Sequence, residues 1–125
     1  MKATDLALGD WVSLDGTPIQ VAGLHGRKVG VHKRRRSIYC SWHLESEFQP
    51  IPLTSGILEK NGYRSTQGID FFWLDDKKHC CMKNYDGKRL FCYKQGINDV
   101  WLVVKYVHQL QHLLRIVGIM KELVL

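Results

Sequence analysis

Two Asp-Gly pairs, each lying between short runs of alternating apolar residues, constrain the fold of this chain more than any other feature. They are Asp15-Gly16 and Asp86-Gly87. A two-residue type I′ turn needs positive φ at both central residues, which Asn, Asp and Gly adopt most readily. The sequence therefore predicts two β-hairpins with two-residue loops, and hence antiparallel sheets.

The first hairpin opens an N-terminal β-unit, which we expect over residues 1–53. A loop of two residues sets Val12 opposite Ile19 and Leu14 opposite Thr17. Short strands with a turn every 8 to 12 residues or so are typical of a small curled sheet or barrel. A barrel-like antiparallel unit is therefore predicted, and its further strands are expected at Lys28 to His32 and at Ser37 to Trp42.

A short linking helix is predicted over residues 54–62. Thr54 is a good N-cap residue, and Leu53 and Leu58 occupy the two positions of a hydrophobic staple. Gly62 suits the left-handed conformation that ends many helices. We expect only about two helical turns, because Gly56 lies within this segment and glycine has a low helix propensity.

The middle of the chain, residues 63–101, predicts a three-stranded antiparallel meander. The loop at Asp86-Gly87 sets Cys81 opposite Cys92. That spacing permits a disulfide without requiring one, so the state of these two thiols stays open.

The preceding hairpin of the meander has a less distinctive loop. If Asp76-Lys77 forms it, Trp73 faces Cys80 and both faces of the meander are partly apolar. One face would then be covered by the C-terminal helix. The N-terminal unit or a second subunit would cover the other.

The last segment, residues 102–125, predicts an amphipathic helix and a terminal strand. Apolar residues recur at helical spacing from Leu102 to Val117, and Gly118 is a stop signal. A last short strand is expected at Glu122 to Leu125. The fold class predicted for the single domain, residues 1–125, is α+β, with the helix packed across one face of the meander.

Three segments carry a resemblance to a known family. They read GDWV at residues 9–12, PIPLTSGILEKNGY at residues 50–63 and KYVHQLQHLL at residues 105–114. With them the chain resembles a family of short uncharacterised proteins associated with gut-bacterial genomes and their phages or other mobile elements. The basic stretch from His25 to Trp42 departs from that pattern. The resemblance implies a gene context and no activity, cofactor or catalytic residue.

The cysteines and the N-terminus bear on location. Residues 1–9 contain one Lys and no apolar core run, so no secretion signal is expected. No stretch approaches the roughly 18 apolar residues that span a bilayer. We therefore predict a cytoplasmic protein with no membrane partner; free thiols are the default state of cysteines there, and the state of Cys81 and Cys92 stays open.

Motifs for catalysis or metal binding are weak. His108 and His112 share a helix face, but Gln109 stands where a zinc protease needs Glu, and two solvated histidines are the simpler interpretation. Cys80 and Cys81 are adjacent and point to opposite faces of a strand, so they do not form a zinc knuckle. No enzymatic activity, catalytic residue, cofactor or metal is predicted.

Charge gives the one distinctive surface feature. The net charge is +6, and six of the 18 basic residues fall within residues 25–36, where there is no acid. Basic residues neutralise phosphates and exposed aromatic rings stack on bases, so this stretch suits nucleic acid. The candidate residues are Arg27, Lys28, Lys33, Arg34, Arg35, Arg36, Tyr39 and Trp42.

Two functions are compatible with this sequence. The first is a non-catalytic module that binds nucleic acid or another polyanion through residues 25–36. The alternative is a protein–protein interaction or assembly accessory factor of a phage or mobile element, with a homo-oligomer formed through a meander face. A third interpretation assigns the basic stretch to a solvated turn whose charges keep a sheet edge from pairing.

Overall fold

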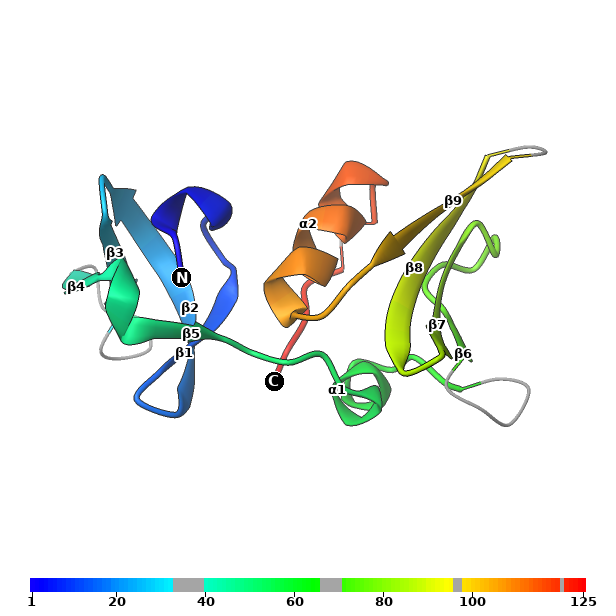
Figure 1. Ribbon diagram of the computed structural model, residues 1–125, viewed down its shortest axis with the longest axis horizontal. Coiled ribbons are helices and arrows are strands. Elements are labelled where there is room, and N and C mark those ends of the chain that lie inside the picture. Colours follow the sequence, from blue (N-terminus) through cyan, green and yellow to red (C-terminus); the bar gives the residue numbers. More distant parts are fainter. Residues whose placement is uncertain (33–39, 66–70, 96–97, 120) are drawn as a thin grey trace. The chain divides into compact units, whose positions relative to one another are not determined.

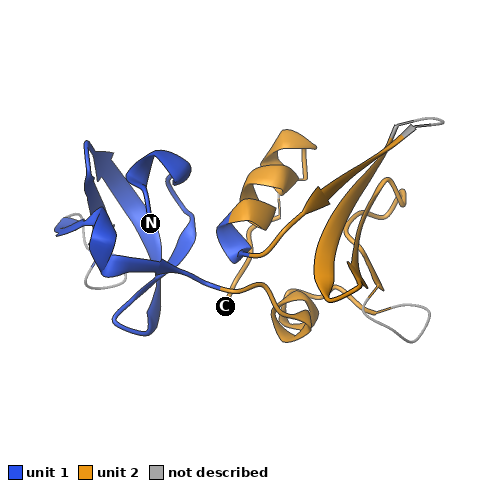
Figure 2. Cartoon of the chain, in the orientation of Figure 1, with its two compact units in different colours: residues 1–51, 106–108 blue, residues 52–105, 109–125 orange. Residues whose placement is uncertain are grey.

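The chain forms two antiparallel sheets and two α-helices in the computed structural model, which describes residues 1–32, 40–65, 71–95, 98–119 and 121–125 (Figure 1). It divides into two compact units, which are coloured separately in Figure 2. The first unit comprises residues 1–51 and 106–108, and the second comprises residues 52–105 and 109–125. The α+β fold class predicted from the sequence is confirmed.

The first unit contains a five-stranded sheet in the order β4-β3-β2-β1-β5. Its strands are β1 (Trp11–Leu14), β2 (Thr17–His25), β3 (Lys28–His32), β4 (Cys40–Leu44) and β5 (Phe48–Pro50). Two short 3-10 turns, η1 (Ala3–Asp5) and η2 (Glu45–Glu47), accompany them. The bounds of β3 are those predicted from the sequence. The predicted start of the next strand, Ser37 to Tyr39, lies outside the described residues.

The first hairpin has the two-residue type I′ loop that the sequence predicts. Asp15 and Gly16 have φ angles of 51° and 79°, and Val12 pairs with Ile19 across the loop. Positive φ at both positions is what a two-residue I′ loop requires. The register of β1 and β2 therefore follows from two residues that are adjacent in the sequence.

The predicted barrel-like closure of this unit is wrong. Among the described strands the sheet is open, with β4 and β5 at its two edges. Instead of a closing strand, Ala3 and Leu6 from the N-terminal segment join the buried cluster of Val12, Val29 and Phe48. The N-terminal segment thus buries apolar surface that a closed barrel would bury with another strand.

The second unit contains a four-stranded sheet in the order β6-β7-β8-β9. Its strands are β6 (Phe71–Trp73), β7 (Cys80–Tyr85), β8 (Lys88–Gln95) and β9 (Asn98–Val103). The predicted three-stranded meander is therefore too short by one strand. A continuous apolar run such as residues 100–104 fits a strand or a helix equally well, and the sequence interpretation assigned its end to the helix.

The register of β6 differs from the prediction by one residue. Trp73 pairs with Cys81, not with Cys80. The loop is longer than two residues because Asp75 Oδ1 accepts hydrogen bonds from the backbone N–H groups of His79 (2.8 Å) and Cys80 (2.9 Å). A slip of one residue moves every side chain of a strand to the opposite face. Phe71 and Trp73 therefore share a face with Cys81, whereas Phe72 lies on the other face.

The linking helix α1 (Ser55–Lys60) has the predicted caps. Thr54 Oγ1 accepts a hydrogen bond from the N–H of Ile57 at 3.2 Å. Leu58 is fully buried, and Gly62 has a φ of 85° just after the helix. The predicted N-cap and the left-handed glycine after the helix are thus confirmed, and the hydrophobic staple stays a prediction.

The C-terminal helix α2 (Val107–Ile116) begins five residues later than predicted, because β9 takes the residues before it. Its end is as expected. Gly118 has a φ of 81°, and the N–H of Ile119 donates to the carbonyl of Leu114 at 2.8 Å, as in a Schellman motif. In the described part of the chain, neither helix has the length and apolar character needed to cross a membrane.

The predicted terminal strand at Glu122 to Leu125 is not formed. Val124 is instead bonded through its backbone to the side chain of Asn61, which donates to the Val124 carbonyl at 2.8 Å and accepts from its N–H at 2.7 Å. Leu123 beside it is buried. A buried amide side chain therefore holds the C-terminus where the sequence pattern predicts a strand.

Candidate nucleic-acid interface

The structure describes three of the eight candidate residues, namely Arg27, Lys28 and Trp42. The other five (Lys33, Arg34, Arg35, Arg36 and Tyr39) lie outside the described residues. By sequence these five belong to the segment that connects β3 to β4, so the described ends of those strands define the surface next to it.

Trp42 lies in a row of three cross-strand neighbours. Gly30 pairs with Trp42 on β4 and with Gly23 on β2. A Cβ built on Gly23 would lie 2.8 Å from Cη2 of the Trp42 ring, and one built on Gly30 would lie 3.1 Å from it. The indole therefore lies over backbone that has no side chains, which is the close approach that glycine in a strand permits.

Trp42 also remains accessible, with a relative exposure of 48%. The outer end of the ring lies close to the backbone of β2 and β3, and the rest of the indole leaves aromatic surface exposed. Aromatic surfaces of this kind stack on unpaired bases, and the contribution is about 1–3 kcal/mol per base. The two glycines leave the space that the ring occupies, and the Cβ of Cys40 is its neighbour on the Gly30 side.

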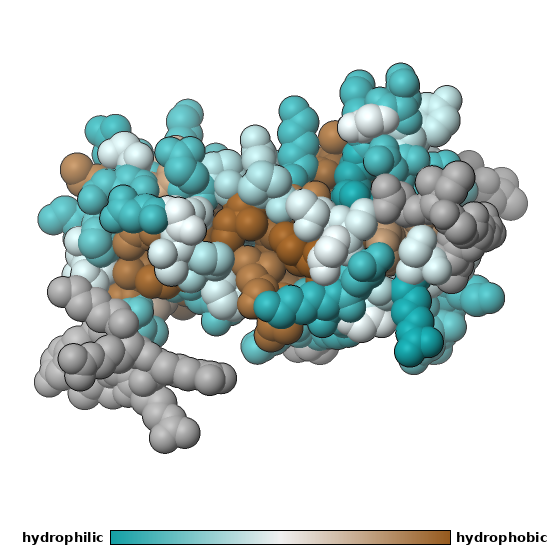
Figure 3. All heavy atoms as spheres, turned by 90° about the horizontal axis from the view of Figure 1, so that it is seen from below, coloured by the Kyte–Doolittle hydropathy of each residue, from teal (hydrophilic) through white to brown (hydrophobic). Residues whose placement is uncertain are grey.

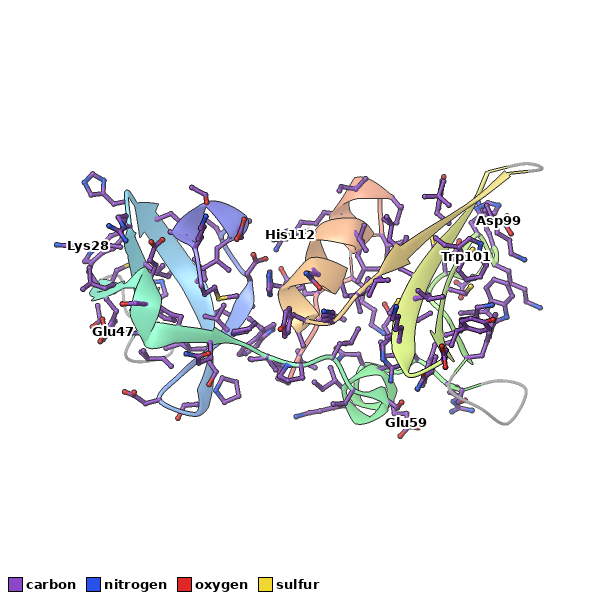
Figure 4. All side chains as sticks on the ribbon, viewed as in Figure 1. Lys28, Glu47, Glu59, Asp99, Trp101 and His112 are labelled. Atoms are coloured by element: carbon purple, nitrogen blue, oxygen red, sulfur yellow. The ribbon has the colours of Figure 1, made fainter. Side chains whose placement is uncertain are left out.

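Basic side chains share this face of the sheet. Side chains at alternate positions of a strand point to the same face, so Lys28 and His32 lie on the face of Gly30. His25 pairs with Lys28 and joins them there. All three residues are exposed, and Lys28 is seen pointing away from the strands in Figure 4. Among the described residues, the face that carries Trp42 therefore combines exposed basic side chains with the exposed apolar Leu44, which pairs with Lys28.

Arg27 is held at the edge of this surface by an acid. Its Nε donates to Glu45 Oε1 at 3.1 Å, while the Arg27 side chain stays 86% exposed. Glu45 Oε2 accepts a second bond from the N–H of Ala3 at 2.6 Å. The Ala3 hydrogen bond, and next the Arg27 one, lower the pKa of Glu45 below its usual value. Glu45 is thus ionised at neutral pH and offsets part of the Arg27 charge.

A shallow hollow of about 340 Å³ lies beside this ion pair. Met1 and Leu44 supply apolar surface there, and Lys2 and Ser46 supply polar groups. The hollow is open to solvent, and its one acid, Glu45, is already paired.

The histidine pair of α2 is not the solvated pair expected from the sequence. His108 is buried, with a relative exposure of 6%, and its ring stacks on that of Tyr106 at 6.0 Å between centroids. His112 is half-buried. The helical pattern did not reveal that part of the polar side is covered. Within the described residues, no three His, Cys, Asp or Glu side chains are arranged to hold a metal ion.

The cysteines of the second sheet are buried thiols. Cys81 and Cys92 pair across β7 and β8, as predicted, and both are free. Burial raises the pKa of Cys81 to about 11, and it also raises the pKa of Cys92. Burial likewise raises the pKa of Cys80 to about 11. These thiols are protonated at neutral pH, so they are poor nucleophiles there.

A second group of lysines and aromatic rings lies on the other sheet and was missed by the sequence analysis. Lys83 Nζ lies 4.3 Å from the centroid of the Trp101 ring, and Lys94 Nζ lies 5.2 Å from that of Trp73. The first contact requires Trp101 to be on a strand beside β8, and the second requires the observed register of β6. The sequence interpretation had no fourth strand, so this arrangement was out of its reach.

Most of the surface visible in Figure 3 is hydrophilic, with some hydrophobic residues exposed among the polar ones. Comparisons of the chain with family models, with curated proteins and with solved structures gave no match. The function proposed below is therefore inferred from the residues of this chain alone.

Proposed function

We propose that the first unit is a non-catalytic module that binds single-stranded nucleic acid. The observation that carries this proposal is the Trp42 indole, which lies over Gly23 and Gly30 and is half exposed. A ring held close against backbone loses little conformational freedom when a base stacks on it. Trp42 is the base-stacking residue in this proposal.

Phosphate contacts would come from the neighbouring basic residues. Lys28 is exposed on the face of Trp42, and the chain that joins β3 to β4 carries Lys33, Arg34, Arg35 and Arg36. Each phosphate neutralised by a basic residue releases counterions, so affinity depends strongly on salt. In this arrangement the basic residues supply most of the affinity, and Trp42 favours unpaired strands over duplex.

Direct binding measurements test this proposal. Fluorescence anisotropy would follow labelled oligo-dT and oligo-U against the purified chain at several salt concentrations. Trp42→Ala should weaken binding by about fivefold to a hundredfold, whereas Trp42→Phe should retain part of the affinity because a ring remains. Arg34→Gln with Arg35→Gln should reduce the salt slope by about 1.4, since each single-strand phosphate contact contributes about 0.7.

A matched control removes the same charge elsewhere. Lys60→Gln with Lys77→Gln also removes two positive charges, from exposed positions of the second unit. It should leave affinity and salt slope nearly unchanged. Equal losses from both double variants would show that only net charge matters, and no binding at low salt would refute the proposal.

A second candidate function is a protein–protein interaction or assembly module. The observation in its favour is the strand β9, where Val100, Trp101, Leu102 and Val103 are all exposed. The resemblance to proteins of phages and mobile elements is compatible with either function and stays a prediction.

A further inference from the structure

Strand β9 exposes four consecutive apolar residues at the edge of its sheet. Relative exposures are 43% for Val100, 41% for Trp101, 43% for Leu102 and 48% for Val103. Among the described strands, β9 pairs only with β8 and is the last strand in the order. Natural edge strands usually carry a charge, a proline or a bulge that prevents pairing with another chain. Residues 100–104 have neither a charge nor a proline.

The backbone of β9 has hydrogen-bonding groups on its outer side. The N–H of Val104 donates to the carbonyl of Arg89 at 2.9 Å, so these two residues form a hydrogen-bonded pair. Bonded and non-bonded pairs alternate along an antiparallel ladder. The next bonded residues are therefore Leu102 and Val100, and the N–H and C=O groups of Trp101 and Val103 point away from β8.

The hydrogen bonds between β7 and β8 lead to the same alternation of bonded and non-bonded pairs. The N–H of Lys94 donates to the carbonyl of His79 at 2.9 Å, which makes Cys81 and Cys92 a bonded pair. The backbone groups of Cys92 therefore point to β7, and its pair with Trp101 on β9 is a non-bonded one. Two independent observations thus indicate that the backbone N–H and C=O groups of Trp101 point away from β8.

The charges at the ends of β9 are complementary to each other. Asp99 is exposed near one end, and Lys105 is exposed just beyond the other. If a second β9 pairs antiparallel about a twofold axis at Leu102, the exposed Asp99 of each copy comes next to the exposed Lys105 of the other. Lys105 lies just beyond the paired residues, because its N–H and C=O are bonded to Gln109 and Leu53 of its own chain, so the attraction is between the two charged side chains alone. An axis at Trp101 would instead set Asp99 opposite Val103.

The side chains match in the same register. Trp101 of one copy lies opposite Val103 of the other, and Leu102 lies opposite itself. Asp99 and Trp101 are on one side of the sheet, as Figure 4 shows, together with Val103. An isologous contact of this kind is the usual one in homodimers. The pairing would cover the four exposed apolar residues and satisfy the outward backbone groups.

We propose that β9 is the dimer interface of this protein, and that a second copy of the chain pairs with it to form one continuous eight-stranded sheet. This proposal concerns the second unit and does not depend on nucleic-acid binding. The other candidate occupant, a strand of a different protein, is excluded if the purified chain dimerises alone through β9.

The oligomeric state of the purified chain is the first test. Sedimentation equilibrium should give a dimer. Val103→Pro removes only an outward N–H, because proline is tolerated where an edge strand faces solvent, and it should raise the dissociation constant by about tenfold or more. Circular dichroism would check that the sheet is kept. A chain that stays monomeric up to about 1 mM would overturn the proposal.

Cysteine cross-linking tests the register and is insensitive to weak association. In a Cys40→Ser background, Leu102→Cys places two thiols opposite each other in a non-bonded pair, with Cα atoms about 4.5 Å apart, which suits a disulfide. Mild oxidation should give a covalent dimer. Val100→Cys is the matched control, since its thiols would lie four residues out of register. Equal cross-linking of both variants would refute the register and the proposal with it.

Charge exchange gives the last test. Lys105→Glu sets two acids next to each other and should weaken the dimer by roughly tenfold. The backbone bond from Lys105 N to Gln109 Oε1 does not involve the altered side chain, so the start of α2 is retained. Adding Asp99→Lys should restore most of the dimer by exchanging the two charges. Failure of this rescue, with Lys105→Glu still weakening the dimer, would refute the register centred on Leu102.

Discussion

The side chain of Asn61 pairs with the backbone of Val124 as a neighbouring strand would. Its Nδ2 donates to the Val124 carbonyl and its Oδ1 accepts from the Val124 N–H, at 2.8 and 2.7 Å. Nδ2 also donates to the carbonyl of Ile57 at 2.8 Å, so the same amide closes helix α1. One buried residue therefore joins the end of a helix to the C-terminal segment.

Loss of the Asn61 amide should destabilise the protein. Asn61 is 5% exposed, and Asn61→Ala removes its two hydrogen bonds to the Val124 backbone and the one to Ile57, which costs about 1–3 kcal/mol. Urea denaturation followed by circular dichroism would measure the change. Asn84→Ala, at an exposed strand position, should change stability by less than about 0.5 kcal/mol. Equal effects would contradict the role assigned to Asn61.

A methyl group at Gly23 or Gly30 should displace the Trp42 indole. The added Cβ would lie 2.8 Å or 3.1 Å from the ring, so the ring must move. We expect a shift in tryptophan emission and weaker oligonucleotide binding, with a loss of stability of about 1 kcal/mol. Because four tryptophans contribute to emission, each spectrum should be compared with that of Trp42→Phe.

Gly56→Ala is the control for that experiment. Gly56 lies in α1 and its nearest neighbour is Thr54 Oγ1 at 3.8 Å, so a methyl group fits. Alanine favours helix over glycine, and a gain of about 0.5–1 kcal/mol in unfolding free energy is expected. The emission of Trp42 should be unchanged. A loss of stability at Gly56 would show that the added group is not accommodated as described.

Glu45 should contribute to the acid sensitivity of the first unit. Its hydrogen bond from Ala3, and next that from Arg27, lower its pKa below the ordinary value of 4.5. A carboxyl whose pKa is lower in the folded state adds stability above the unfolded pKa, and this is lost as the pH falls through the folded pKa. Glu45→Gln should therefore reduce the dependence of stability on pH below about 4.5. Parallel acid unfolding curves for both proteins would contradict this.

The four thiols should differ in their reactivity. Cys40 is half-buried, whereas Cys80, Cys81 and Cys92 are buried. Burial raises the pKa of Cys80 and of Cys81 to about 11. At pH 8 a disulfide reagent should therefore react with Cys40 first, and Cys40→Ser should remove the fast phase. A fast phase that persists in that variant would show that the second sheet opens readily.

The parts of the fold that the sequence predicted are those set by adjacent residues. Asp15-Gly16 and Asp86-Gly87 determine their hairpins locally, and Thr54 caps its helix locally. The errors arise where distant residues decide. The register of β6 depends on Asp75 bonding to backbone groups four and five residues later. The strand β9 depends on pairing with β8, since its apolar run is ambiguous by itself.

The candidate site likewise has one part that the sequence predicted and one part that depends on distant residues. Trp42 was predicted as a stacking residue from its position after a basic run. Its support by Gly23 and Gly30 was not predicted, because Gly23 reaches that row only through a register shift between Val21 and Gly23. The isolated Gly23 within a strand is the sequence signal that could have indicated this bulge. Binding of nucleic acid by this surface stays a prediction.

The hydrogen bonds of Asp75 have a consequence for the interior of the second unit. With one residue fewer in that loop, β6 would turn over, and Phe72 would exchange sides with Phe71 and Trp73. The protein would then have to accommodate an indole where it now holds a benzyl ring, and Lys94 would lose its aromatic neighbour. A single half-buried carboxylate thus selects which aromatic rings meet the solvent.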